Sequence, residues 1–223
     1  MALSYYITAR GQLEFPAGPD ASEQALREKV RAAYLAGVDT VQVREKDLPD
    51  GRLARLVEDL RMLRERTVAG KPSAGKPVPE KTVSRLLVNE RLDIAVSSGA
   101  DGVHLPSDSL PLAAVRSHVG PAGVVGISCH TEEDVAQASR DGASYVLLGP
   151  VFETPSKPGG KPLGIPLLGR ICRRSAVPVF ALGGVNRENA ESCVRAGAAG
   201  IAGIRLFQQT GDLAQLCRYL HSL

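Results

Sequence analysis

The segment that decides the fold is PVFALGGVNRENAESCVRAGAAGIAGI, residues 178–204. Its pattern predicts a strand over 178–184, a helix over 186–197 and a second short strand over 200–204. A strand, a helix and a further strand in direct succession form a βα repeat, and repeated βα units indicate a parallel sheet. The fold then depends on how often this repeat occurs.

The same alternation extends through all 223 residues. Short apolar runs that predict strands are found at 5–8, 40–45, 85–90, 101–105, 123–128, 145–149, 178–184 and 200–204. A helical segment follows each of them. Eight such units predict a single-domain α/β fold over 1–223, a (β/α)8 TIM barrel. The alternative is a doubly wound sheet, which normally needs fewer units.

One segment interrupts the alternation. Residues 67–84, TVAGKPSAGKPVPEKTVS, are rich in proline, glycine and lysine, which predicts a loop. Because this loop precedes the third strand, we expect it at the N-terminal face of the barrel, away from the usual active site. We interpret its lysines as solvating groups.

Composition narrows the classes of partner. A net charge of +3, no Trp and few other aromatic residues argue against a nucleic-acid-binding protein. No apolar run approaches the ~20 residues that span a membrane, and no leader peptide is recognisable. Four widely spaced cysteines are typical of reduced thiols. We therefore expect a soluble cytoplasmic protein without nucleic-acid or membrane partners. The oligomeric state stays open, with a homo-oligomer among the alternatives.

Polar residues occupy inward positions at the end of the second strand. Alternate residues of a barrel strand point inward, which puts Gln42, Arg44 and Lys46 on one face. Left unpaired there, they would cost several kcal/mol. At the C-terminal mouth they would instead meet an anionic, hydrogen-bonding ligand. The alternative is an internal salt-bridge network with the nearby acids Glu45, Asp47 and Glu90.

Other strand ends are polar or glycine-rich as well. They carry Asn89, His104, Ser128, His130, Gly183, Gly184 and Arg205. Glycines after the seventh strand, together with the eighth strand, form the usual phosphate cup of such barrels, and Arg205 would add a bidentate contact. The alternative for Gly183 and Gly184 is a tight βα turn.

The loop at 149–164, GPVFETPSKPGGKPLG, predicts a second anion site. Thr154, Ser156 and Lys157 offer two hydroxyls and an ammonium, which suit phosphoryl oxygens. Two phosphate sites at one barrel mouth indicate two phosphorylated substrates that are joined, or one large substrate.

Several linked segments, in the same order and over nearly the whole chain, resemble the thiamine-phosphate synthase and TenI family. They are VQVREKD, LLVNERLDIAVSSGADGVHL, VGISCHTEEDVAQA, YVLLGPVFETPSKPGG and residues 178–204. The resemblance implies a (β/α)8 barrel. For a synthase it implies joining of hydroxymethylpyrimidine pyrophosphate to thiazole phosphate, with release of pyrophosphate. In that reaction bond breaking comes first, and the thiazole nitrogen captures the pyrimidine carbocation.

The resemblance also implies roles for individual residues. Gln42 and Ser128 would lie near the pyrimidine, and Thr154 and Ser156 on the thiazole side, with Gly184 at the thiazole-phosphate cup. The residues implied to contact pyrophosphate are Arg44, Lys46, Asn89 and Lys157. His130 matches a histidine that serves in acid–base proton transfer in the thiazole tautomerases of the TenI branch. The catalytic candidates are Lys157, Arg44 and His130.

Magnesium is the cofactor that the resemblance implies. The candidate ligands are Glu90 and Asp108. Synthases carry Asn-Asp after the third strand where this chain has Asn89 and Glu90, and Gly-Gln-x-Asp after the fourth where this chain has residues 106–109, PSDS. Magnesium demands near-ideal octahedral geometry, so these departures bear directly on its binding.

The prediction that follows is a transferase of thiamine biosynthesis, a thiamine-phosphate synthase. The intact set on the pyrophosphate side favours it, because a tautomerase has no obvious use for all four residues. One alternative is a TenI-type thiazole tautomerase, an isomerase that uses His130 as general acid and base. The other is a non-catalytic binder of thiamine precursors.

Overall fold

Eight parallel strands close into a barrel in sequence order. The structure, a computed structural model, describes residues 1–15, 17–18, 20–69, 84–120, 122–155 and 159–223. The strands are β1 (Leu3–Ile7), β2 (Thr40–Val43), β3 (Arg85–Asn89), β4 (Gly102–Leu105), β5 (Val124–Cys129), β6 (Tyr145–Leu148), β7 (Val179–Ala181) and β8 (Gly200–Gly203). The predicted single-domain (β/α)8 barrel is thereby confirmed.

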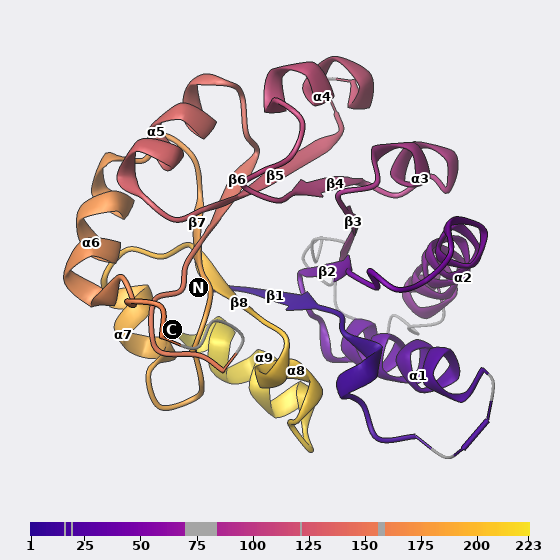
Figure 1. The fold of residues 1–223 in the computed structure, drawn as a ribbon. Coiled ribbons are helices and arrows are strands. Elements are labelled where there is room, and N and C mark those ends of the chain that lie inside the picture. Colours follow the sequence, from indigo (N-terminus) through magenta and orange to yellow (C-terminus); the bar gives the residue numbers. More distant parts are fainter. Residues whose placement is uncertain (16, 19, 70–83, 121, 156–158) are drawn as a thin grey trace.

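Helices surround the strands as an outer ring (Figure 1). They are α1 (Ala21–Ala36), α2 (Asp50–Ala69), α3 (Leu92–Ser97), α4 (Leu112–Val119), α5 (Glu132–Arg140), α6 (Gly164–Arg174), α7 (Ala190–Arg195), α8 (Arg205–Gln208) and α9 (Leu213–Ser222). The short helices η1 (Arg10–Gln12) and α8 were not predicted. Of the loop predicted at 67–84, residues 70–83 lie outside the described residues, and α2 continues to Ala69.

Local sequence signals set the helix ends. Helix α1 ends at Gly37, whose φ of 83° lies in the left-handed region that glycine adopts without strain. Helix α5 begins with a capping box, in which the Thr131 side chain accepts from the Asp134 amide while the Asp134 carboxylate accepts from the Thr131 amide. Helix α1 therefore ends, and helix α5 begins, at residues whose local sequence favours that boundary.

The barrel interior forms a hydrophobic cluster of its own, separate from the larger one between strands and helices. It consists of Tyr5, Ile7, Leu87, Val124, Tyr145, Leu147, Phe180 and Ala202. Gly126 makes room for the Tyr145 ring, because a Cβ at position 126 would lie 2.0 Å from Tyr145 Cζ. Two tyrosine hydroxyls are thus buried inside the barrel, and their hydrogen bonds shape the site above them.

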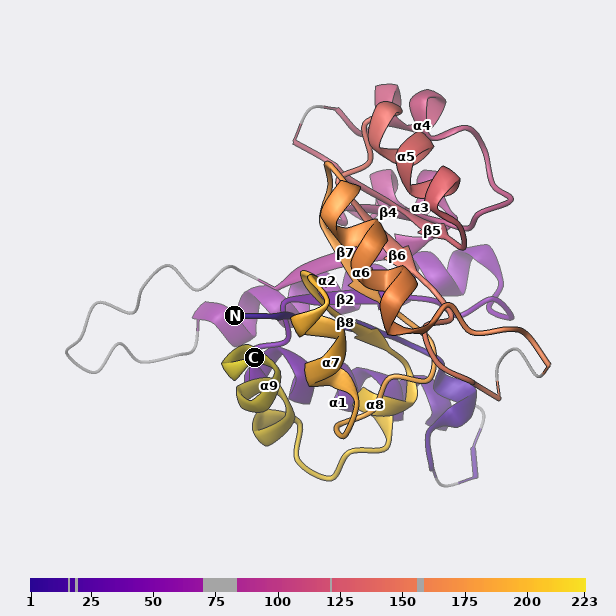
Figure 2. The same cartoon turned by 90° about the vertical axis from the view of Figure 1, so that its left-hand side faces the viewer.

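The two faces of the barrel differ in what they carry. Figure 2 shows both chain termini on one side of the barrel, and the segment between β6 and α6 on the opposite side. That opposite side holds the C-terminal ends of the strands, where barrel enzymes place their active sites. Within the described ranges, no helix is long and apolar enough to cross a membrane.

Candidate active site

A pocket of about 700 Å³ opens at the C-terminal ends of the strands, a size usual for a small-molecule site. The sequence-predicted residues that line it are Gln42, Arg44, Lys46, Asn89, Asp108, Ser128, His130, Thr154, Gly183, Gly184 and Arg205. Glu90 is not among the lining residues. Ser156 and Lys157 lie outside the described residues. The structure therefore brings together side chains from most of the barrel's strands.

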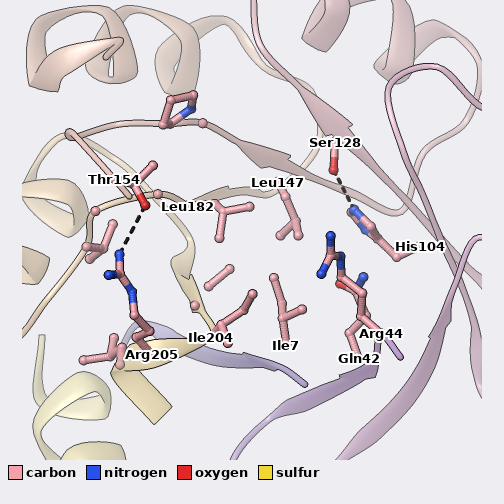
Figure 3. A pocket seen from close by; sticks show the side chains of 18 of the residues that line it. Ile7, Gln42, Arg44, His104, Ser128, Leu147, Thr154, Leu182, Ile204 and Arg205 are labelled. Atoms are coloured by element: carbon pink, nitrogen blue, oxygen red, sulfur yellow. Dashed lines mark hydrogen bonds between the residues drawn. The ribbon is translucent and has the colours of Figure 1, made fainter. Parts of the chain in front are cut away.

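The pocket has a cation on each side and an apolar floor between them. Figure 3 shows Arg44 and Arg205 on opposite sides of the cavity. The apolar side chains between them are Ile7, Leu147, Leu182 and Ile204. Such a cavity suits a ligand, or a pair of ligands, with flat apolar parts in the middle and an anionic group at each end.

The cations at the Arg44 side have no carboxylate partner in the part of the chain that the structure describes. The two nearby acids form ion pairs with Arg10, whose guanidinium lies 3.0 Å from the Glu45 carboxylate and 2.6 Å from the Asp47 carboxylate. No ion pair of the described residues includes Arg44 or Lys46. The alternative salt-bridge network with Glu45 and Asp47 therefore does not form. Two uncompensated cations at a pocket mouth favour binding of an anion.

The opposite side combines Arg205 with the turn after β7. Arg205 Nη2 donates to Thr154 Oγ1 over 3.3 Å (Figure 3). Gly183 and Gly184 have φ values of 90° and 68°. In the described part of the chain, the backbone N–H of neither glycine donates a hydrogen bond. The tight turn and the phosphate cup are therefore compatible, because the turn leaves N–H donors for an anion.

The glycine at position 184 is required by close packing as well as by φ. A Cβ there would lie 2.4 Å from the Glu153 carbonyl oxygen. We expect Gly184→Ala to lower the free energy of unfolding by about 3 kcal/mol, measured by urea denaturation. Gly142→Ala is the control, because Gly142 also has a positive φ, 84°, but has open space around its Cβ position. Gly142→Ala should lower the free energy of unfolding by only about 1 kcal/mol. Equal decreases in the two variants would contradict the packing argument.

Below the pocket, a continuous chain of hydrogen bonds crosses the barrel. It runs from Ser128 Oγ to His104 Nε2 (2.9 Å), from His104 Nδ1 to Tyr145 OH (2.9 Å), to Tyr5 OH (2.6 Å), to Gln42 Oε1 (2.9 Å), and from Gln42 Nε2 to Asn89 Oδ1 (2.8 Å). Tyr5 and Tyr145 were not predicted as site residues from the sequence. The alternation of inward and outward residues along a strand predicts that both side chains point into the barrel. It does not predict that their hydroxyls form a hydrogen bond with each other.

His104 is held neutral inside the barrel. Burial, with a smaller contribution from the positive charge of Arg44, lowers the pKa of His104 to about 3. Its side chain is 2% exposed. A neutral imidazole has one donor and one acceptor nitrogen, which matches its two hydrogen bonds, to Tyr145 and Ser128.

This burial predicts a specific acid sensitivity. The unfolded chain binds a proton at His104 near pH 6.5 and the folded chain only near pH 3, so stability is lost as pH falls through this window. Between pH 6.5 and pH 5, protonation of His104 in the unfolded chain should lower the free energy of unfolding by about 2 kcal/mol, measured by urea denaturation. His104→Gln should remove this part of the pH dependence. His118→Gln, at an exposed position, should retain it, and an identical slope for His104→Gln and the unmodified protein would refute the account.

His130 lies at the pocket wall with a fixed ring. Its Nδ1 donates to the Gly149 carbonyl, and its backbone N–H donates to Asp134 Oδ2 over 2.8 Å. A carbonyl only accepts, so the neutral ring carries its proton on Nδ1 and has Nε2 as the basic nitrogen.

The acids near the pocket do not form a protein-made metal cage. No group of three or more His, Cys, Asp or Glu side chains in the described residues is arranged to hold a metal ion. Glu90 is exposed, with a φ of 66°, and Asp108 contributes a single carboxylate to the pocket lining. These residues fit magnesium only as a companion of a ligand that brings further oxygens, which is how magnesium is held with phosphates.

Comparisons with known proteins show the family of the chain. The family model described as thiamine monophosphate synthase matches residues 15–207. The thiamine-phosphate synthase of Roseiflexus castenholzii is 42% identical over 82% of this chain and 74% of its own length. That of Roseiflexus sp. strain RS-1 is 38% identical over 91% and 80%. The solved thiamine phosphate pyrophosphorylase of Pyrococcus furiosus superposes with a TM-score of 0.77 and 26% identity, covering 99% of this chain and 94% of that one. The chain belongs to the thiamine monophosphate synthase family.

Proposed function

We propose that this protein is a thiamine-phosphate synthase, a transferase that joins hydroxymethylpyrimidine pyrophosphate to thiazole phosphate. The observation that carries the proposal is the division of one pocket into two anion-binding sides. Among the described residues, Arg44 and Lys46 have no ion-pair partner at one side. At the other side, Arg205 lines the pocket with Gly183 and Gly184, whose backbone N–H groups have no acceptor among those residues. One substrate brings a pyrophosphate and the other a single phosphate, which matches this division.

The chemistry asked of the site is mainly electrostatic. The bond between the pyrimidine's methylene carbon and the pyrophosphate oxygen breaks, and a bond from that carbon to the thiazole nitrogen forms. Arg44 and Lys46 stabilise the negative charge that develops on the departing pyrophosphate. The family resemblance implies that Lys157, in the sequence that follows β6, contributes a further cation to the pyrophosphate. The apolar floor holds the two rings against each other, so that the nitrogen meets the carbon directly.

Magnesium is part of this proposal at the pyrophosphate side. Asp108 would hold it together with substrate oxygens, and the ion would supply further neutralisation of the pyrophosphate charge. Asp108→Asn is expected to raise the magnesium concentration for half-maximal binding of inorganic pyrophosphate about tenfold, measured by calorimetry. Asp141→Asn removes an acid outside the pocket lining and should leave this concentration unchanged. If Asp108→Asn left this magnesium concentration unchanged, Asp108 would not be a magnesium ligand.

The test of the proposed function is a coupling assay with the purified chain. Incubation with both substrates and magnesium should yield thiamine phosphate and pyrophosphate in equal amounts. His130→Ala should leave appreciable synthesis if His130 is peripheral to this reaction. Isomerisation of a thiazole carboxylate phosphate without coupling, abolished by His130→Ala, would instead identify a tautomerase. Binding of both substrates without turnover would identify a non-catalytic binder.

A further inference from the structure

The polar chain across the barrel has both of its ends in the pocket. Ser128 and Asn89 line the cavity, whereas Tyr5 is 1% exposed and Tyr145 5% exposed. Burial raises the pKa of both tyrosine hydroxyls, so each keeps its single proton. The two hydroxyls therefore connect Ser128 and His104 to Gln42 and Asn89 below the pocket and have no water-facing alternative.

The direction of every hydrogen bond in this chain follows from Gln42. Gln42 Oε1 can only accept, so Tyr5 donates its proton to it. Tyr5 must then accept from Tyr145. Tyr145 has given its proton to Tyr5 and must accept from His104 Nδ1, which places the imidazole proton on Nδ1.

The consequence reaches the pocket at Ser128. With its proton on Nδ1, neutral His104 has only a lone pair at Nε2, so Ser128 donates its hydroxyl proton to that nitrogen. Ser128 Oγ then offers only lone pairs to a ligand. At the other end of this chain of hydrogen bonds, Gln42 Nε2 donates to Asn89 Oδ1. Asn89 therefore presents its side-chain NH₂ group to a ligand as a donor.

We propose that Tyr5 and Tyr145 form a directional hydrogen-bond relay that fixes the His104 tautomer and thereby makes Ser128 an acceptor toward the ligand ring. In this proposal Asn89, for which the family resemblance implies a pyrophosphate contact, is instead a donor toward the ring. Both tyrosines are positioning residues, because neither lines the pocket. The choice of a pyrimidine ring as the ligand rests on the proposed function. The relay itself rests on the buried geometry alone.

A pocket with this polarity discriminates between two kinds of pyrimidine edge. An aminopyrimidine presents an N–H donor beside a ring-nitrogen acceptor, which complements an acceptor at Ser128 and a donor at Asn89. A pyrimidinone presents the reverse order, a carbonyl oxygen beside a ring N–H. A mismatched edge leaves buried polar groups unpaired, which is the costly outcome. The relay therefore selects amino- over oxo-substituted rings.

The first test reads the His104 tautomer by ¹⁵N NMR of the ligand-free protein, with His104→Gln to assign the signals. The unmodified protein should carry the proton on Nδ1. In Tyr5→Phe, Tyr145 loses its acceptor and donates to His104 Nδ1, so the proton should move to Nε2. Tyr6→Phe is the matched control: its buried hydroxyl has no hydrogen-bond partner in the described part of the chain, and the tautomer should stay unchanged.

Three results would overturn the relay: a proton on Nε2 in the unmodified protein, no change in Tyr5→Phe, or the same change in Tyr6→Phe. The first does not depend on Tyr5→Phe, so the proposal remains testable even if that variant does not fold. A protein that shows the Nδ1 tautomer but never couples its substrates would contradict the proposed function and leave the relay standing.

The second test measures ring selection with 4-aminopyrimidine and 4-pyrimidinone as probes. The unmodified protein and Tyr6→Phe should bind the aminopyrimidine roughly tenfold more tightly, and Tyr5→Phe should bring the two affinities together. Affinity for inorganic pyrophosphate should be the same in all three proteins, because Arg44 and Lys46 are unchanged. Equal affinities for both rings in the unmodified protein would refute selection by the relay.

Discussion

Replacing Arg44 by glutamine is expected to weaken binding of inorganic pyrophosphate and to lower kcat/KM for the pyrimidine pyrophosphate, each by about a hundredfold. Arg44 stands half-buried at the pocket wall, and no acid in the described residues neutralises it. A bidentate guanidinium contact to a multiply charged anion is among the strongest single contacts a protein makes. Glutamine keeps much of the side chain's length and loses the charge, so the variant isolates the electrostatic contribution.

The control for this prediction is Arg91→Gln, which makes the same change of charge outside the pocket lining. Arg91 is already paired with two carboxylates, those of Asp50 and Asp93. Surface ion pairs of this kind contribute little, so pyrophosphate affinity and kcat/KM should change less than about twofold. If Arg44→Gln behaved like Arg91→Gln, the pyrophosphate would have to bind elsewhere.

Replacing Arg205 by glutamine is expected to affect the other substrate. We expect KM for thiazole phosphate to rise at least about thirtyfold, with pyrophosphate affinity unchanged. Arg205 lies across the apolar floor from Arg44 and contacts Thr154 (Figure 3). Its guanidinium and the N–H groups of the β7 turn would share the single phosphate.

Steady-state kinetics with one substrate varied at a time separate these effects. Arg195→Gln is the control, since Arg195 pairs with Glu191 on α7 and lies outside the pocket lining. The account requires a crossed pattern, in which each pocket arginine governs a different substrate. A variant that raises KM for both substrates equally would indicate one shared anion site.

The fold was predictable because the βα repeat is a local pattern. The errors are at element ends, where specific contacts decide. Helix α7 begins at Ala190 and not near 186, because the Asn186 side chain accepts from the amides of Glu188 and Asn189 and forms a turn there. Strand β7 ends at Ala181 because the glycines at 183 and 184 adopt positive φ.

The site was predictable to the extent that it follows from strand alternation. Gln42, Arg44 and Ser128 point inward because their parity is set by the strand, and all three line the pocket. The contact between Tyr5 and Tyr145 joins residues 140 positions apart, and it depends on how the closed barrel staggers its strands. The pairing of Arg10 with Glu45 and Asp47, which leaves Arg44 uncompensated, likewise depends on tertiary structure.

The central claim is that one pocket holds two anionic substrates at once, at opposite sides. Isothermal calorimetry tests it most directly, with thiazole phosphate titrated into the protein before and after saturation with inorganic pyrophosphate. The account predicts binding in both titrations with affinities within about threefold of each other, and loss of only the pyrophosphate site in Arg44→Gln. Mutual exclusion of the two ligands, with the apparent affinity for thiazole phosphate falling in proportion to the pyrophosphate concentration, would contradict it.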